Sequence, residues 1–408
     1  MKNKAVVLGA NYYIGLSVIR CLGIMHIPVA AVDYGRDGTY GFYSKYCTER
    51  IIGPHYRKDP EGLVNFLIEY AKKQNAPPVL FPCADPYVAF VDDHLLQLKK
   101  YYLIPQKEQG LYTEVMNKET LHALAVKHGV LVPETLRIDE ENYMDKVEKY
   151  IGYPCLVKPT DSPAFVSKFR QKLFKAEHRE ELEKYISLAT EAHLDVIIQR
   201  IIPGFDDQMH TFDAYINQQG KVTHWLTCQK YRQYPINFGA SVYTGQKYVP
   251  ELFDIGASFL EAIEFKGFAE IEFKQDIETK KFYLIEINVR TTNLNHLLYK
   301  SGINMPYVAY KDLLGESLDA YAVTHDTNYV FWYAFEDFLA VRNYLRTGQL
   351  TLKQIIKSYF RKKAYAIWDW KDPLPMLIFS KKLLARGIKK LFKKTNSLKY
   401  IHKSQQNG

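Results

Sequence analysis

The sequence predicts a chain that begins as an α/β unit and continues as a mixed α+β body. Residues 1–110 alternate short apolar strands with helical stretches, which is typical of a parallel sheet. Residues 195–320 carry several strands that read as antiparallel, and the chain becomes aromatic and helical from about residue 321. A length of 408 residues is enough for two or three domains. We therefore expect domains over residues 1–110, 111–320 and 321–408.

The first region supports this prediction element by element. Strands are expected over residues 5–8, 27–32 and 79–82, with helices near residues 14–23 and 64–73. The start of the chain reads as a strand and lacks the apolar core and cleavage site of a signal peptide.

The first turn of this region contains two glycines that raise the question of a dinucleotide site. Gly9 and Gly15 do not form the Gly-x-Gly-x-x-Gly pattern of such sites. Glycine that permits a tight turn is the better interpretation.

The second region begins with a helical run over residues 118–128 and an apolar strand, YPCLVKP, over residues 153–159. Lys158 ends this strand and must find an anion or remain near water. Phosphate is the natural partner of such a point charge. The alternative is a surface lysine whose stem lies along apolar neighbours.

Two further strands carry charged side chains at their ends. Residues 195–204 are an apolar strand that runs into a Pro-Gly turn, and Asp206 and Asp207 follow it. Lys230 and Arg232 end another strand and would share one face if that strand continues regularly. Facing an acidic surface they could bind phosphate oxygens, whereas on a solvated edge they would have no such role.

The most informative stretch is a hairpin that opposes two carboxylates. A turn centred at Thr279 gives these pairs: Glu272 with Glu286, Ile271 with Ile287, and Phe273 with Ile285. The polar face of the hairpin would carry Glu270, Glu272, Glu286, Asn288 and Arg290. Directly opposed like charges destabilise a sheet. We therefore expect a divalent cation with oxygen ligands, Mg²⁺ shared with substrate phosphates, to offset the repulsion.

Charge is distributed unevenly along the chain. The net charge is +9, from 54 Lys and Arg against 45 Asp and Glu, and nine cations but no acids follow Asp372. Apolar side chains recur at helical spacing among the lysines of residues 381–394, so residues 376–403 favour an amphipathic helix on an anionic membrane surface. A disordered tail is the alternative, and nucleic acid is a weaker candidate partner.

Cysteine and hydropathy patterns favour a cytoplasmic protein, peripheral at the inner membrane face if the tail binds lipid. No apolar run approaches the ~20 residues of a membrane-spanning helix. The cysteines form no Cys-x-x-Cys pair, and we expect free thiols in a reducing compartment. They are Cys21, Cys47, Cys83, Cys155 and Cys228. No pattern indicates an oligomeric state.

In this order, the motifs resemble the ATP-grasp superfamily. They are YPCLVKP (153–159), IIQRIIPG (197–204) followed by two aspartates, QKYRQYP (229–235) and GFAEIEFKQD…FYLIEINVR (267–290). They are similar to those of carboxylate–amine ligases related to D-aspartate ligase, over roughly residues 1–320. The resemblance implies an ATP-grasp fold with a Rossmann-like pre-ATP-grasp domain, two α+β subdomains and a C-terminal helical extension.

The resemblance also implies roles for individual residues. ATP would be bound by Lys118, Lys158, Ser162 and the linker near residues 199–204, with the adenine on Gln199, Arg200, Ile201 and Ile202, and the ribose near Asp206 or Asp207. Mg²⁺ (or Mn²⁺) would be held by Glu272, Glu286 and Asn288. Arg290, Lys230 and Arg232 would act on the phosphates and the phosphorylated intermediate. In the loop after the hairpin, we expect Asn293 and Asn295 to contact the substrate and His296 to be structural.

Two departures from the family pattern stand out. Residues 160–165, after Lys158, lack the glycines of many members, although the Ser162 hydroxyl could donate to a phosphate. Glu270 stands where the D-alanine ligase branch has an arginine, which argues against D-alanyl-D-alanine synthesis.

The implied function is ATP-dependent amide formation through an acyl phosphate, on an amino acid or a cell-envelope or polysaccharide precursor. The substrates would be a small carboxylate and an amine. The alternatives are acid–thiol ligation and a membrane-associated scaffold on an inactive ATP-grasp body.

Overall fold

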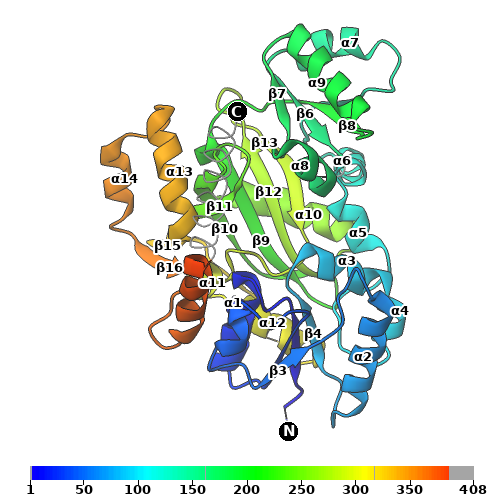
Figure 1. The fold of residues 1–408 in the computed structure, drawn as a ribbon, viewed down its shortest axis with the longest axis vertical. Helices are drawn as coiled ribbons and strands as arrows, with labels where there is room; N and C mark the ends of the chain where they lie inside the picture. The colour runs from blue at the N-terminus through cyan, green and yellow to red at the C-terminus, as the bar shows by residue number, and fades with distance from the viewer. Residues whose placement is uncertain (1, 161, 317, 386–408) are drawn as a thin grey trace, which may run out of the picture.

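The protein, as a computed structural model, is described for residues 2–160, 162–316 and 318–385. Three sheets follow one another along the long axis of the molecule (Figure 1). The N-terminal parallel sheet lies at one end, a small antiparallel sheet lies at the other, and the largest sheet lies between them.

The N-terminal region is a parallel α/β unit, as the sequence predicts. Its sheet has the order β3-β2-β1-β4, with every neighbouring pair parallel. The strands are β1 (Ala5–Leu8), β2 (Val29–Asp33), β3 (Glu49–Ile52) and β4 (Val79–Pro82). The helices are α1 (Tyr13–Ile24), α2 (Pro60–Lys72), α3 (Asp85–Asp93) and α4 (Leu95–Leu98).

The turn between β1 and α1 explains the first two glycines. Gly9 has a φ of +94°, and a Cβ on Gly15 would lie 2.2 Å from the carbonyl oxygen of Gly9. A side chain at either position would therefore disrupt the turn, because the first conformation favours glycine and the second leaves no room.

The second region forms a small lobe around an antiparallel sheet of order β5-β8-β6-β7. Its strands are β5 (Thr135–Arg137), β6 (Cys155–Pro159), β7 (Phe174–Ala176) and β8 (Val196–Arg200). Its helices are α7 (Tyr143–Lys146), α8 (Ser162–Phe169) and α9 (Arg179–Glu191). Two helices, α5 (Leu111–Met116) and α6 (Lys118–Lys127), precede the lobe, and the Asn117 side chain caps α6.

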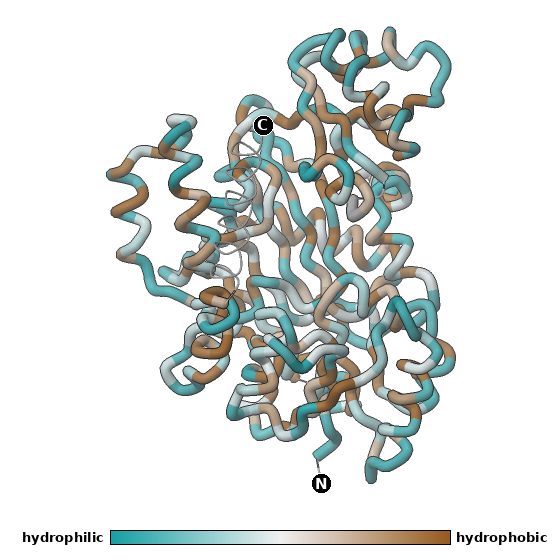
Figure 2. Tube along the Cα trace, in the orientation of Figure 1, coloured by the Kyte–Doolittle hydropathy of each residue, from teal (hydrophilic) through white to brown (hydrophobic). Residues whose placement is uncertain are grey.

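The large sheet has the order β13-β12-β9-β10-β11-β15-β16, and β14 also pairs with β10. Its first strands are β9 (Met209–Ile216), β10 (Val222–Tyr234), β11 (Ala240–Gln246), β12 (Gly267–Gln275) and β13 (Phe282–Asn288). The helices α10 (Pro250–Ala262), α11 (Asn295–Lys300) and α12 (Met305–Leu313) belong to the same region. Figure 2 shows hydrophobic and hydrophilic residues alternating along its strands, as expected where the two faces have different surroundings.

The segment after residue 320 contributes strands as well as the expected helices. It contains β14 (Tyr321–Ala322), β15 (Tyr329–Trp332), α13 (Ala334–Arg346), α14 (Leu352–Ser358) and β16 (Lys362–Tyr365). β15 pairs antiparallel with β11, and β16 pairs parallel with β15. The C-terminal segment therefore completes the large sheet.

Part of the basic tail belongs to the body. Residues 374–385 form a helix in which Phe379 is buried, and Ile378 and Leu383 pack against the core that contains α1. The remainder of the predicted amphipathic helix, from residue 386 to 403, lies outside the described residues. Among the helices that are described, none is long and apolar enough to cross a bilayer.

The predicted hairpin forms, with one correction to its register. Glu272 lies opposite Glu286 and Ile271 opposite Ile287, which confirms these pairs. An irregularity between Glu272 and Phe273 places Phe273 opposite Leu284, so the predicted pairing with Ile285 is wrong. The bulge inserts one extra residue in one strand. It therefore shifts by one residue the pairing of the positions between the bulge and the turn.

A second irregularity removes the condition, a regular strand, under which Lys230 and Arg232 would share a face. The register of β10 against β11 shifts on both sides of Arg232. Lys230 bonds to Glu272 of the hairpin, with 2.6 Å between Nζ and Oε1. Arg232 instead donates from Nε and Nη2 to Asp337 of α13, at 2.6 and 2.9 Å. This fully buried pair ties the C-terminal segment to β10.

We expect Arg232→Met to lower the free energy of unfolding by about 3 kcal/mol or more, because it leaves the Asp337 carboxylate buried without its cation. Urea unfolding followed by circular dichroism measures the change. The double variant Arg232→Met/Asp337→Leu should recover most of the loss. A double variant as unstable as the single one would contradict the ion pair as the cause.

Candidate active site

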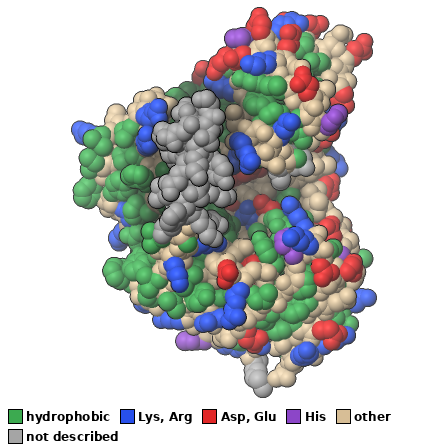
Figure 3. Space-filling model, in the orientation of Figure 1, with side chains coloured by type: hydrophobic (Ala, Val, Ile, Leu, Met, Phe, Trp, Pro, Cys, Tyr) green, Lys and Arg blue, Asp and Glu red, His purple; other side chains and the backbone are tan. Residues whose placement is uncertain are grey.

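A cleft of about 740 Å³ lies where the small lobe, the N-terminal region and the large sheet meet. Figure 3 shows a hollow between the lobe and the body, with side chains of both charges at its edge. The cleft brings together predicted residues from four segments: Lys118, Lys158, Gln199, Arg200, Ile201, Ile202, Glu272, Glu286, Asn288, Arg290 and Asn293.

Lys158 at the end of β6 is buried in the cleft wall and is not a surface lysine. Its side chain is 8% exposed, and Nζ donates to Gln199 Oε1 at 2.8 Å. Gln199 in turn donates from Nε2 to Thr135 Oγ1 at 3.0 Å, which fixes the amide. Burial, and then the positive charge of Lys118, lower the pKa of Lys158 to about 7.

The floor of the cleft is the acidic face of β12 and β13. Burial raises the pKa of Glu272, although the Lys230 ammonium at 2.6 Å opposes this shift. Burial acts in the same sense on Glu286, but the charges of Lys118, Lys230 and Lys158 outweigh it and lower its pKa. Lysines therefore offset much of the carboxylate repulsion that the sequence assigned to a metal.

The floor nevertheless suits a hard divalent cation. Glu272, Glu286 and Asn288 offer only oxygen ligands to one cleft, which is the donor set that Mg²⁺ prefers. Asn288 donates from Nδ2 to Glu270 Oε2 at 3.0 Å, while its Oδ1 accepts from Arg290 Nη2 at 3.1 Å. No described set of three His, Cys, Asp or Glu forms a complete metal cage. Substrate oxygens would have to complete the coordination shell.

Asp85, Glu270 and Asp213 form a second acidic group near Arg290. Arg290 donates from Nε to Asp85 Oδ1 at 2.5 Å, which joins the hairpin to the start of α3. Glu270 is 2% exposed, and its Oε1 has no hydrogen-bond partner within the described part of the chain. Burial, and then the charges of Asp213 and Glu272, raise the pKa of Glu270 well above its usual value. Burial also raises the pKa of Asp213, to about 7.

Three predicted site residues have structural partners instead. Asp206 lies in a short 3₁₀ turn beneath β10 and accepts from Gln233 Nε2 at 2.8 Å and from the Asn237 backbone N–H at 2.9 Å. Asn295 is 1% exposed and donates to Ser17 Oγ at 3.0 Å, so it anchors α11 to α1. Arg232 binds Asp337 outside the cleft.

The remaining predicted residues are placed as follows. Asp207 is not among the described residues that line the cleft, and its carbonyl oxygen accepts from Gln229. Ser162 begins α8, and its side chain lies outside the described part of the structure. His296 has the expected structural contact through one ring nitrogen, with 2.7 Å between Nδ1 and the carbonyl oxygen of Tyr365.

The cleft also contains residues that the sequence reading missed: Tyr12, Tyr13, Asp85, Lys172, Gln233 and Phe238. Asp85 and the Tyr12–Tyr13 pair follow β4 and β1 of a parallel sheet. Ligands of such sheets bind beyond the carboxyl ends of the strands, so this rule could have identified them. Lys172 and Phe238 lie in loops without a comparable signal.

Comparison with known proteins agrees with this geometry. The family model for the D-ala D-ala ligase C-terminus matches residues 122–317. The chain is 26% identical over 285 residues to D-aspartate ligase of Enterococcus faecium, covering 66% of this chain and 67% of that protein.

Solved structures share the fold at low identity. N5-carboxyaminoimidazole synthetase of Staphylococcus aureus has a TM-score of 0.60 at 16% identity, covering 79% of this chain and 80% of the other. The biotin carboxylase domain of Hydrogenobacter thermophilus 2-oxoglutarate carboxylase, solved with MgADP and bicarbonate, has a TM-score of 0.60 at 16% identity, covering 81% and 74%. L-amino acid ligase of Bacillus licheniformis has a TM-score of 0.56 at 14% identity, covering 77% and 75%. The described chain therefore has the ATP-grasp fold, and its similarities are those of an ADP-forming ATP-grasp ligase.

Proposed function

We propose that this ligase joins a carboxylate to an amine through an acyl phosphate. The observation that carries the proposal is the arrangement of one cleft, with the buried Lys158 and the partly exposed Lys118 on one wall, a floor of carboxylate and amide oxygens, and Arg290 beside it. Such a cleft can bind a triphosphate at the lysines while a carboxylate lies within reach of the arginine.

In the first step a carboxylate oxygen attacks the γ-phosphorus of ATP, and the bond to the β-phosphate oxygen breaks to release ADP. Lys118 and Lys158 hold the phosphates, and residues 200–202 hold the adenine. When bound, Mg²⁺ (or Mn²⁺) neutralises phosphate charge, and Glu272, Glu286 and Asn288 would hold it.

In the second step the amine nitrogen attacks the acyl carbon, phosphate leaves with the bonding electrons, and the nitrogen gives up a proton to form the amide. Arg290 stabilises the charge that develops on the oxygen, because its guanidinium is held in place by Asp85 and Asn288. Glu270 also lines the cleft, and its Oε1 has no hydrogen-bond partner among the described residues.

The names of two similar proteins, D-aspartate ligase and L-amino acid ligase, support an amino acid as one substrate. The second substrate would be an amine on a cell-envelope or polysaccharide precursor. A screen of amino acids with amines and thiols, read by ADP release and product mass, tests this assignment. ADP release without a product whose mass is the sum of the two substrates less one water would contradict ligation, and a thioester product would contradict the amine.

We expect Glu286→Gln to reduce ATP turnover roughly 100-fold or more while the protein stays folded, because it removes one charge from the proposed metal site. ADP release with the identified substrates measures the loss. Glu278→Gln in the exposed turn of the same hairpin is the matched control and should retain full activity. Near-normal turnover in Glu286→Gln would contradict the metal assignment.

Lys158 provides a test that depends on pH. Its pKa of about 7 leaves it largely uncharged at pH 8, and bound triphosphate should raise that pKa. ATP binding at pH 8 should therefore take up a proton, and ATP affinity should fall as pH rises above 7. Calorimetry in buffers of different ionisation enthalpy measures the uptake. Lys158→Arg stays charged and should bind ATP without it, so equal uptake in that variant would contradict the assignment.

A further inference from the structure

A second pocket, of about 850 Å³, lies away from the ATP cleft. Its walls come from the end of α1, the segment before β3, the helix α11 and residues 363–371. We call it the WDW pocket after Trp368-Asp369-Trp370. Its volume is within the roughly 300–1,000 Å³ of small-molecule sites.

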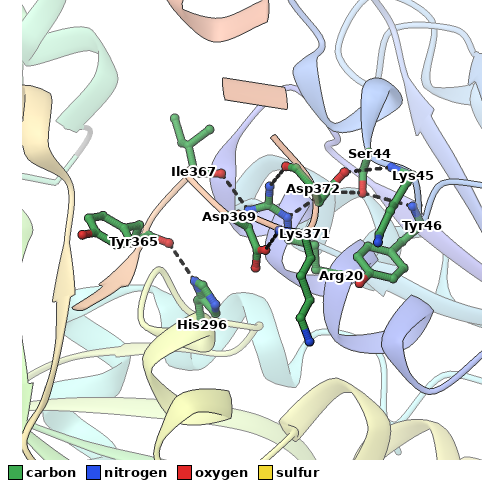
Figure 4. A network of polar contacts seen from close by, with 10 residues as sticks. All are labelled: Arg20, Ser44, Lys45, Tyr46, His296, Tyr365, Ile367, Asp369, Lys371 and Asp372. Carbon is green, nitrogen blue, oxygen red and sulfur yellow. Dashed lines mark hydrogen bonds and ion pairs between the residues drawn. The ribbon is translucent and has the colours of Figure 1, made fainter. Parts of the chain in front are cut away.

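The WDW segment is fixed to the N-terminal region by a buried network (Figure 4). Arg20 of α1 donates to the carbonyl oxygen of Ile367 at 2.7 Å and to the Asp372 carboxylate at 2.9 Å. Asp372 also accepts from Ser44 Oγ at 2.7 Å and from the Lys45 backbone N–H at 2.9 Å. The wall is therefore a built part of the fold and not a loose surface loop.

The charges that face the pocket are predominantly positive. Lys45, Lys300 and Lys371 come from three different segments, and their Nζ atoms have no acidic partner in the described part of the chain. Figure 4 shows the Lys371 side chain extending away from the network. Asp369 is the one acid among the described lining residues, and it accepts from the Lys371 backbone N–H at 2.7 Å.

The other lining groups suit a ring with polar substituents. Trp368 and Trp370 stand edge to face with centroids 4.9 Å apart, and Trp370 is 83% exposed. His296 donates from Nδ1 to the Tyr365 carbonyl oxygen, because a carbonyl can only accept, and this leaves Nε2 as an acceptor. Burial keeps the ring neutral by lowering the pKa of His296 to about 4.

The WDW pocket and the ATP cleft lie at opposite ends of α1. Tyr12, Tyr13 and Ile14 line the cleft, whereas Gly23 and Ile24 line the WDW pocket. A helix of 12 residues is roughly 18 Å long. The two sites can therefore be occupied at the same time.

We propose that the WDW pocket binds a phosphorylated ring compound, either a sugar phosphate or a mononucleotide. Lys45, Lys300 and Lys371 bind the phosphate, as point charges on flexible stems suit phosphate oxygens. The indole of Trp370 stacks on the ring. His296 Nε2 accepts from a hydroxyl or amide of the ligand. This site is independent of the proposed ligase reaction.

Isothermal titration of the full chain tests the proposal, with saturating MgADP present to fill the ATP cleft. The probes are UMP, glucose 6-phosphate and inorganic phosphate. We expect saturable 1:1 binding of UMP or glucose 6-phosphate, at least about tenfold tighter than inorganic phosphate, and the preferred probe identifies the class. Lys371→Ala and Trp370→Ala should each weaken that binding about tenfold.

Lys184→Ala, an exposed lysine of α9, is the matched control and should bind normally. All variants should unfold at the wild-type temperature, since the substituted side chains are exposed. The proposal is overturned if neither ring compound binds at millimolar concentration, if inorganic phosphate binds equally well, or if the two pocket variants bind like wild type.

Discussion

The cost of burying carboxylates side by side governs the arrangement of this protein. Glu270 lies opposite Asp213 of β9 on one side and Asn288 of β13 on the other, while Glu272 lies opposite Glu286. Such a floor is stable only if cations from elsewhere reach it. Lys230 does so from β10, and Lys118 and Lys158 act from α6 and the small lobe. The lobe and α6 therefore each contribute a cation to the charge balance of the floor.

Because of this charge balance, the cleft is suited to bind both anionic and cationic ligands. Glu286 remains ionised because lysines surround it, whereas Lys158 is close to losing its proton because it is buried. A bound triphosphate favours the charged lysine, and a bound cation favours the charged carboxylates. Each ligand relieves a penalty that the folded protein carries in its absence. Preorganised charge of this kind is the main contribution a protein makes to phosphoryl transfer.

Local pattern was enough to predict the parallel N-terminal strands, the Glu272–Glu286 pair and the lysine that ends β6. Prediction from local pattern failed where one irregular residue changed the partner that a side chain contacts. A bulge sends Arg232 to α13, and a 3₁₀ turn places Asp206 under β10, although both residues stand at the expected positions in the sequence. It also failed where partners are distant, as for β15 with β11 and for Asn295 with Ser17. Aromatic and β-branched residues in Tyr329–Trp332 were an available strand signal.

The contact between Arg20 and Asp372 has a consequence for the order in which the chain assembles. These residues are 352 positions apart, and the side chain of Arg20 is almost completely buried by the contact. During synthesis, Arg20 of α1 cannot form its ion pair until the ribosome has added Asp372. Contacts of such separation slow folding and prolong the exposure of unfinished surfaces. In a nascent chain that ends before residue 372, the Arg20 cation would lack the Asp372 carboxylate that pairs with it in the complete fold.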